Sequence, residues 1–242
     1  MKYFLMTFIA MFVALLIIVD TGAAQEPLNI QVVTGGHNYQ VELYKVFMDK
    51  PEWTWAHEYP AEHAYRGDLR KKFDVIVMYD MTVPDIGDKA KKNLREFIEA
   101  DKGVVVIHHA ILNQGYGEWW WRDIVGGLYL REPNPMGNPV NSTFEHDIEI
   151  AVRPRGKHVI TDGLGEFSII DEAYKGQWFS DRINVIMETD HEKADGPLVW
   201  IGPTDQSRIV HMQLGHDKQA YLNPKFQELV RRAILWAGGK LK

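Results

Sequence analysis

Histidines occur at the points where several predicted strands end. His37 follows a pair of glycines, His108 and His109 close an apolar run, and His216 lies in a Gly-His-Asp triplet. In open α/β sheets, ligands bind outside the carboxyl ends of the strands, so side chains from distant segments can meet in one pocket. Imidazole exchanges protons near neutral pH and binds divalent metals. We therefore predict that His37, His108 and His216 serve one catalytic site.

The absence of cysteine narrows the chemistry that these histidines can support. With no Cys in the chain, thiol nucleophiles, thiolate metal sites and disulfides are excluded. The chain has no Gly-x-Ser-x-Gly elbow for a serine nucleophile and no His-Glu-x-x-His metal motif. Two alternatives stay open: acid–base catalysis without a metal, and a divalent ion such as Zn²⁺ held by His37, His108 and His216. Because neighbouring side chains on a strand alternate, either His108 or His109 is expected to be structural.

Strands alternate with helices in the first half of the chain. Apolar runs predict strands over 28–34, 73–79 and 104–107, with an extended piece near 53–58. An amphipathic stretch covers 41–48, and helical periodicity covers 88–100. This order predicts a doubly wound α/β fold with a mainly parallel sheet. His37 and His108 then lie at carboxyl ends of strands.

The second half of the chain is less regular. A Trp-rich helix is predicted over 118–125, and a Gly/Pro/Asn-rich loop follows from 126 to about 139. Strands are predicted over 145–152, 184–188, 198–201 and 208–214, some of them antiparallel. The last helix has Asn223 as N-cap, Pro224 at its first position and Gly238 as its stop.

The first residues have the pattern of a secretory signal peptide. Lys2 precedes an apolar run over 3–19, and small residues follow up to Ala24. We expect residues 1–24 to be removed, which leaves a single domain over 25–242 in the periplasm or outside the cell. An uncleaved membrane anchor is the alternative. After cleavage, no membrane association is expected.

Charge and composition limit the partners. The formal net charge of −6 gives no basic face for nucleic acid. Gly35 and Gly36 lack the remainder of a phosphate-loop signature, so no nucleotide cofactor is expected. A small carbohydrate suits the aromatic residues better, because sugars present apolar C–H faces. We assign Asn38, His109, Trp119 and Tyr174 to substrate binding.

Several short segments together resemble one known family. These are 33–37, 103–108, 126–127, Asp171-Glu172-Ala173-Tyr174, 215–217 and 233–237. In order and spacing they are similar to the ThuA-like (trehalose utilisation) family over nearly the whole mature chain. The resemblance implies a flavodoxin-like, class I glutamine amidotransferase-like fold: a three-layer sandwich around a mainly parallel sheet.

The same resemblance suggests a function in carbohydrate utilisation. The amidotransferase cysteine would fall near His108, and its absence rules out glutamine hydrolysis by that mechanism. His37, His108, Glu172 and His216 match the family pattern and become the expected catalytic residues. Glu172 or His108 would remove a proton beside a carbonyl, while His37 and His216 polarise or protonate oxygens.

The resulting expectation is an exported enzyme that isomerises or cleaves a keto-sugar or disaccharide. A non-catalytic carbohydrate-binding protein is the alternative, and a structural partner in a cell-surface complex is a third. The sequence does not decide whether the protein forms an oligomer.

Overall fold

The computed structural model describes residues 26–132, 134–137 and 140–242. The predicted signal peptide, residues 1–24, lies outside the described residues, as do positions 138 and 139 at the end of the predicted loop. Within the described part of the chain, no helix has the length and apolar character needed to cross a membrane.

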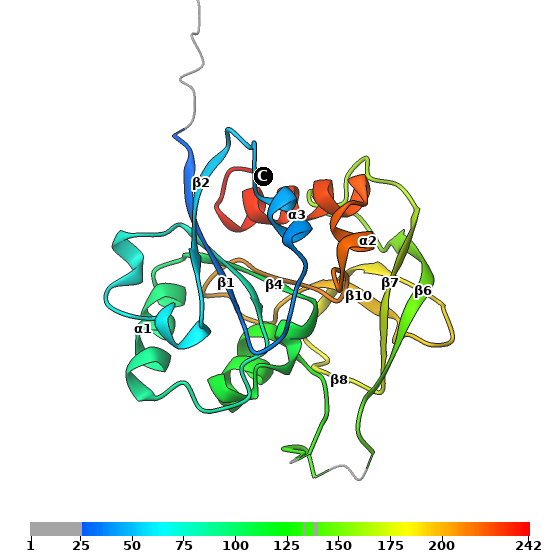
Figure 1. Ribbon diagram of the computed structural model, residues 1–242, viewed down its shortest axis with the longest axis horizontal. Helices are drawn as coiled ribbons and strands as arrows, with labels where there is room; N and C mark the ends of the chain where they lie inside the picture. The colour runs from blue at the N-terminus through cyan, green and yellow to red at the C-terminus, as the bar shows by residue number, and fades with distance from the viewer. Residues whose placement is uncertain (1–25, 133, 138–139) are drawn as a thin grey trace, which may run out of the picture.

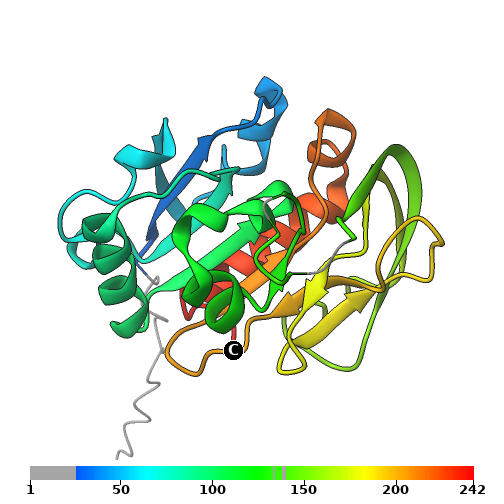
Figure 2. The same cartoon turned by 90° about the horizontal axis from the view of Figure 1, so that it is seen from below.

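A nine-stranded sheet runs through the molecule in the order β2-β1-β3-β4-β11-β10-β9-β6-β7 (Figures 1 and 2). Strands β2, β1, β3, β4 and β11 are parallel, and the strands from β11 to β7 pair antiparallel. The predicted α/β fold with a large, mostly parallel central sheet is therefore confirmed. The bounds of the strands are β1 Leu28–Gly35, β2 Trp53–Glu58, β3 Val75–Asp80, β4 Gly103–Ile107, β6 Thr143–Pro154, β7 Phe167–Lys175, β9 Asn184–Glu188, β10 Pro197–Ile201 and β11 Ile209–Met212.

Helical segments cover both faces of the parallel strands. Helix α3 (Pro224–Ala237) lies on one face, and α1 (Asp88–Glu99) lies on the other with most of the shorter helical segments (Figure 2). Alternation along β3 explains the two layers: Val75 and Val77 belong to the core under α3, whereas Ile76 and Met78 belong to the core under α1. The shorter elements are η1 Val41–Val46, η2 Ala61–His63, η3 Leu69–Lys71, η4 His108–Leu112, η5 Gln114–Tyr116, the π-helix η6 Trp120–Val125, α2 Lys218–Tyr221, and a small sheet of β5 Gly127–Leu128 and β8 Trp178–Phe179.

Local signals account for the ends of α3. The Asn223 side chain accepts hydrogen bonds from the amides of Lys225 (2.9 Å) and Phe226 (3.2 Å), as predicted for an N-cap. Pro224 occupies the first turn, where its missing N–H costs nothing. The apolar residues of this helix are buried against the sheet; they are Phe226, Leu229, Val230, Ala233, Ile234 and Ala237.

Two segments differ from the sequence prediction. The amphipathic stretch over 41–48 forms only the short 3₁₀ helix η1, and Val41 at its start is 71% exposed. Strand β7 was not predicted, because its sequence carries two adjacent carboxylates, Asp171 and Glu172, and both of them are buried. Burial of acidic groups on neighbouring positions conceals the alternation by which a half-buried strand is usually detected.

The turn after β1 depends on a glycine. Gly36 has φ 73°, and a Cβ there would lie 1.9 Å from the carbonyl oxygen of Met81. We expect Gly36→Ala to reduce the free energy of unfolding by on the order of 3 kcal/mol, from a strained backbone and a forced shift of the neighbouring chain. Urea denaturation measures the loss.

Gly87→Ala is the matched control for this substitution. Gly87 also has a positive φ, 83°, but a Cβ there would meet nothing within 4 Å. Only the backbone cost of about 1 kcal/mol is expected. Equal losses in the two variants would contradict the proposed clash with Met81.

Candidate functional site

His108 occupies a strained turn at the carboxyl end of β4. Its φ is 51°, a left-handed value that is uncommon for a residue other than glycine, and its side chain is fully buried. The 3₁₀ helix η4 begins at the same residue. Strand β4 therefore ends in a sharp turn at His108, and backbone strain of this kind is concentrated at functional sites.

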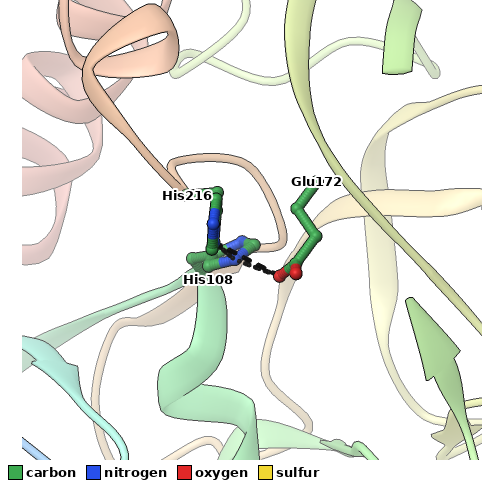
Figure 3. Close-up of side chains that lie close together, drawn as sticks. All are labelled: His108, Glu172 and His216. Atoms are coloured by element: carbon green, nitrogen blue, oxygen red, sulfur yellow. Dashed lines mark hydrogen bonds and ion pairs between the residues drawn. The ribbon is translucent and has the colours of Figure 1, made fainter. Parts of the chain in front are cut away.

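Glu172 and His216 meet His108 from two other elements (Figure 3). His216 lies on the loop after β11, which is the parallel neighbour of β4, and Glu172 lies on β7 in the antiparallel part of the sheet. His108 Nε2 is 2.9 Å from Glu172 Oε2 and 3.1 Å from His216 Nδ1. The third side of this triangle, between His216 Nδ1 and Glu172 Oε2, measures 3.3 Å. Residues far apart in the sequence thus direct three ligand atoms at one point.

The hydrogen bond on the far side of the His108 ring determines what Nε2 can do. His108 Nδ1 lies 2.5 Å from the Gln213 carbonyl oxygen, which can only accept, so Nδ1 carries a proton. In the neutral ring Nε2 is then a lone-pair acceptor that faces a carboxylate oxygen. A second proton on the ring or a cation would relieve the repulsion between these two atoms, and the Tyr174 hydroxyl, 2.9 Å from Nε2, can also donate to it. Donation from one imidazole nitrogen to a backbone carbonyl is also the usual arrangement of a metal-binding histidine.

The triangle has nearly the dimensions of a zinc site. Tetrahedral Zn²⁺ with bonds of about 2.1 Å keeps its ligand atoms about 3.4 Å apart, so the three side chains need to move by only a few tenths of an ångström. Two imidazoles and one carboxylate are a common ligand set of catalytic zinc, whose fourth position stays open for water or substrate. Among the described residues, His37 is not part of this group, although the sequence made it a metal candidate with His108 and His216.

The pKa values of Glu172 and His216 are shifted in the directions expected of an ion pair. Burial raises the pKa of Glu172, but hydrogen bonds and charges of His108 and His216 outweigh this effect and lower the pKa below its usual value. Burial lowers the pKa of His216, but the interaction with Glu172 outweighs it and raises the pKa above the usual value. The carboxylate therefore stays ionised at neutral pH and can hold a cation.

Asp171, the neighbour of Glu172, points to the other side of β7 and fixes the His216 loop. Its carboxylate accepts hydrogen bonds from the amides of Gly215 (2.7 Å), His216 (2.9 Å) and Glu172 (2.9 Å). The Tyr79 hydroxyl donates to the Gly215 carbonyl oxygen at 2.7 Å. The loop that carries His216 is thus held through its backbone, which presets the position of the ring.

We expect Asp171→Ala to weaken metal binding by roughly 10- to 100-fold, the usual cost of losing an outer partner of a ligand. The affinity would fall because the backbone of Gly215 and His216 is no longer held by the Asp171 carboxylate, although the ligand side chains themselves are unchanged. Competition against a zinc-sensitive dye measures the affinity. Asp217→Ala is the control, since the Asp217 side chain caps α2 through the Gln219 amide. An unchanged affinity in Asp171→Ala would contradict this positioning role.

The site also contains His146, which the sequence did not single out. Its Nδ1 lies 3.2 Å from Glu172 Oε1, and its ring centroid is 4.8 Å from that of His216. The register of β6 against β7 shifts between Glu145 and Ile148, and Asp147 has φ 56°. This bulge turns His146 toward Glu172, as bulges beside active sites often do. A bulge has no local sequence signal, so only the fold reveals this residue.

A cavity of about 380 Å³ opens beside Glu172, whereas His108 and His216 are not among its lining residues. This volume is within the range of small-molecule sites. It is lined by His37, Met81, His109, Leu112, Tyr129, Leu130, Arg131, Asn141, Ser142, Phe144, His146, Glu172 and Tyr174. Apolar and aromatic side chains alternate in this lining with many polar and charged ones, a mixture that suits a sugar, which carries both C–H faces and hydroxyl groups.

The predicted substrate-binding residues occupy different places. Tyr174 reaches the centre, with its hydroxyl 2.9 Å from His108 Nε2. His109 lines the same cavity, and its buried Nε2 contacts the Tyr79 carbonyl oxygen at 3.2 Å. Asn38 lies in an adjoining depression. Trp119 stacks under the Arg95 guanidinium, 3.9 Å from its ring centroid, and is not among the residues that line the cavity.

His109 has the structural character expected of one member of the histidine pair. Burial, followed by the nearby His108 and His37 rings, lowers the pKa of His109 well below its usual value. The ring therefore stays neutral. It packs between Tyr79 and His37, at centroid distances of 4.5 and 4.6 Å. His109 forms a wall that separates the site from the core.

Comparisons with known structures support the fold. The chain is similar to a ThuA-like protein from Parabacteroides merdae, with a TM-score of 0.72 and 18% identity over 90% of this chain and 92% of that one. A ThuA-like protein from Bacteroides uniformis gives a TM-score of 0.69 and 16% identity over 92% and 96% of the two chains. PurLQS from Thermotoga maritima gives 0.57 and 10% over 88% and 99%. The expected glutamine amidotransferase-like fold is confirmed.

At the level of sequence, no curated protein matches the chain. A family model described as ThuA, trehalose utilisation, matches residues 42–237, which include His108, Glu172 and His216. The segments that suggested the resemblance, apart from 33–37, fall inside this match. The chain therefore belongs to the ThuA family, which is linked to trehalose utilisation.

Proposed function

We propose that this protein is a carbohydrate-utilisation enzyme that moves a proton beside the carbonyl of a keto-sugar, assisted by a divalent ion held by His108, Glu172 and His216. The observation that carries this proposal is the triangle of ligand atoms, with sides of 2.9, 3.1 and 3.3 Å, at the edge of a sugar-sized cavity. A cation in this position would polarise the sugar carbonyl oxygen.

His37 is suited to accept the proton. Its Nδ1 lies 2.7 Å from the Asn38 carbonyl oxygen, so Nδ1 carries the proton and Nε2 is the basic nitrogen. The side chain is exposed and lines the cavity. Imidazole is a general base of suitable strength at neutral pH.

Proton removal leads to either of two outcomes. The electron pair of the broken C–H bond moves to the carbonyl oxygen and gives an enediolate. Return of the proton to the former carbonyl carbon, with transfer of the adjacent hydroxyl proton to the former carbonyl oxygen, completes an isomerisation. If the enediolate instead expels an oxygen substituent from the β-carbon, the bond to the second sugar is cleaved. His146, beside Glu172, is placed to protonate the departing oxygen.

We place this enzyme outside the cytoplasm, on the basis of the signal-peptide pattern of residues 1–24. An extracytoplasmic carbohydrate enzyme would act on sugars before or during uptake. Fractionation of cells that produce the tagged full-length protein tests this location. N-terminal sequencing then shows whether the chain begins at Gln25, as cleavage after Ala24 requires.

Hydrogen exchange tests the proposed chemistry without knowledge of the final product. The zinc-loaded protein is incubated in D₂O with fructose and with lactulose, a keto-disaccharide, and the C–H signals beside the carbonyl are followed by ¹H NMR. Exchange that is lost in His37→Ala supports the proposal. Tight binding of these sugars without exchange would instead favour a non-catalytic carbohydrate-binding protein.

A further inference from the structure

A second depression adjoins the cavity beyond His37. It has a volume of about 670 Å³ and is lined by Gly36, His37, Asn38, Tyr39, His57 and Tyr59. His37 borders both spaces, because it also lines the cavity beside Glu172. The two spaces therefore meet at the His37 ring, which belongs to the lining of both.

The fold explains why the two spaces adjoin. The depression lies at the carboxyl ends of β1 and β2, which are parallel neighbours at one edge of the sheet. The carboxyl ends of β4 and β11 face the same edge. Ligands of open α/β sheets bind along this edge, so the depression continues the binding crevice outward.

The side chains of the depression combine aromatic rings with polar groups. Tyr59 is 65% exposed, an unusual position for a large ring, and Tyr39 is half-buried. The His57 ring is fixed by Thr34, whose hydroxyl lies 2.7 Å from Nε2. Asn38 is exposed at the rim. Rings that cover an apolar face, with hydrogen-bonding groups around them, match a pyranose, which carries hydroxyls around a C–H face.

We infer that this depression is a subsite for the second sugar ring of a disaccharide, with Tyr59 as its platform and Asn38 and His57 as its polar contacts. The inference rests on the proposed function, because it takes the reacting sugar to lie in the cavity beside Glu172. The expected substrate is then a disaccharide or another glycoside, since a single sugar ring would leave the depression empty.

Binding of a disaccharide and of its component sugar tests the subsite. Dissociation constants of lactulose and of its keto-sugar component fructose are measured by ligand-observed NMR titration of the zinc-loaded full chain. In the unchanged protein, lactulose should bind at least about 10-fold more tightly than fructose, because the second ring adds buried contacts. Tyr59→Ala should remove most of this difference and leave fructose binding unchanged.

Leu222→Ala is the matched control, since Leu222 is also an exposed large residue, at 46%, and does not line either space. Melting temperatures of both variants establish that they fold. Lactulose affinity that is unchanged in Tyr59→Ala would overturn the subsite while fructose binding still supports the main cavity. An equal loss of affinity for both sugars in Tyr59→Ala would overturn it as well, because it would place Tyr59 in the cavity itself. Binding of neither sugar to the unchanged protein would overturn the subsite, and the exchange assay would then decide the proposed function separately.

Discussion

Replacing Glu172 with glutamine should abolish metal binding and turnover while the protein stays folded. Glutamine keeps the size of the side chain but removes the charge that balances a divalent ion between two imidazoles. The affinity for Zn²⁺ should fall by more than the roughly 10- to 100-fold expected for an outer partner such as Asp171. Equilibrium dialysis followed by elemental analysis measures the metal, and the exchange reaction with fructose measures the activity.

Glu149→Gln is the control for the loss of a carboxylate. Glu149 lies on β6, is exposed, and pairs with Ile170, so it is not one of the three ligand residues. Metal content and exchange should stay at the level of the unchanged protein. Full metal content in Glu172→Gln would show that the three side chains do not form the binding site.

At position 108, the glycine variant should be more stable than the alanine variant, which is the reverse of the usual order. Both substitutions remove the Nε2 ligand and should eliminate metal binding and activity. At a buried position with ordinary φ, glycine is less stable than alanine by about 0.5 to 1 kcal/mol. At φ 51°, however, an L-residue with a Cβ costs roughly 1 to 2 kcal/mol. We therefore expect the free energy of unfolding of His108→Gly to exceed that of His108→Ala by about 1 kcal/mol. His108→Gly should accordingly unfold at a higher urea concentration.

Ala110→Gly gives the comparison at a nearby buried position in the same 3₁₀ helix. Ala110 is not among the described residues with positive φ, so its change to glycine should reduce stability by about 1 kcal/mol. If His108→Ala proves as stable as His108→Gly, the strained elbow is not a property of the protein in solution.

The sequence predicted the parts of the site that follow strand ends. His108 and His216 could be placed together because β4 and β11 have strong apolar patterns, and parallel strands present their carboxyl ends at one edge. Glu172 came instead from the family resemblance, since its own surroundings do not read as a strand. Its partner β6 lies across the antiparallel part of the sheet, and such pairing leaves no local signal.

Other features of the site could be recognised only in the folded structure. His146 reaches Glu172 only because β6 bulges, and the amide contacts of Asp171 depend on a loop more than forty positions away in the sequence. Trp119 was assigned to substrate binding as an aromatic ring; in the structure its ring packs against the Arg95 guanidinium and is not among the residues that line the cavity. Spacing along an element decides which of its residues share a face, but not which part of the fold that face meets.

Metal content tests the central claim most directly. The full-length protein is purified without chelator, and its zinc and other divalent metals are measured together with those of Glu172→Gln, His216→Ala and His37→Ala. We predict about one equivalent of metal in the unchanged protein and in His37→Ala, and almost none in the other two. A metal-free protein that still catalyses exchange, or a metal that persists in Glu172→Gln, would contradict the assignment of the ligand triangle.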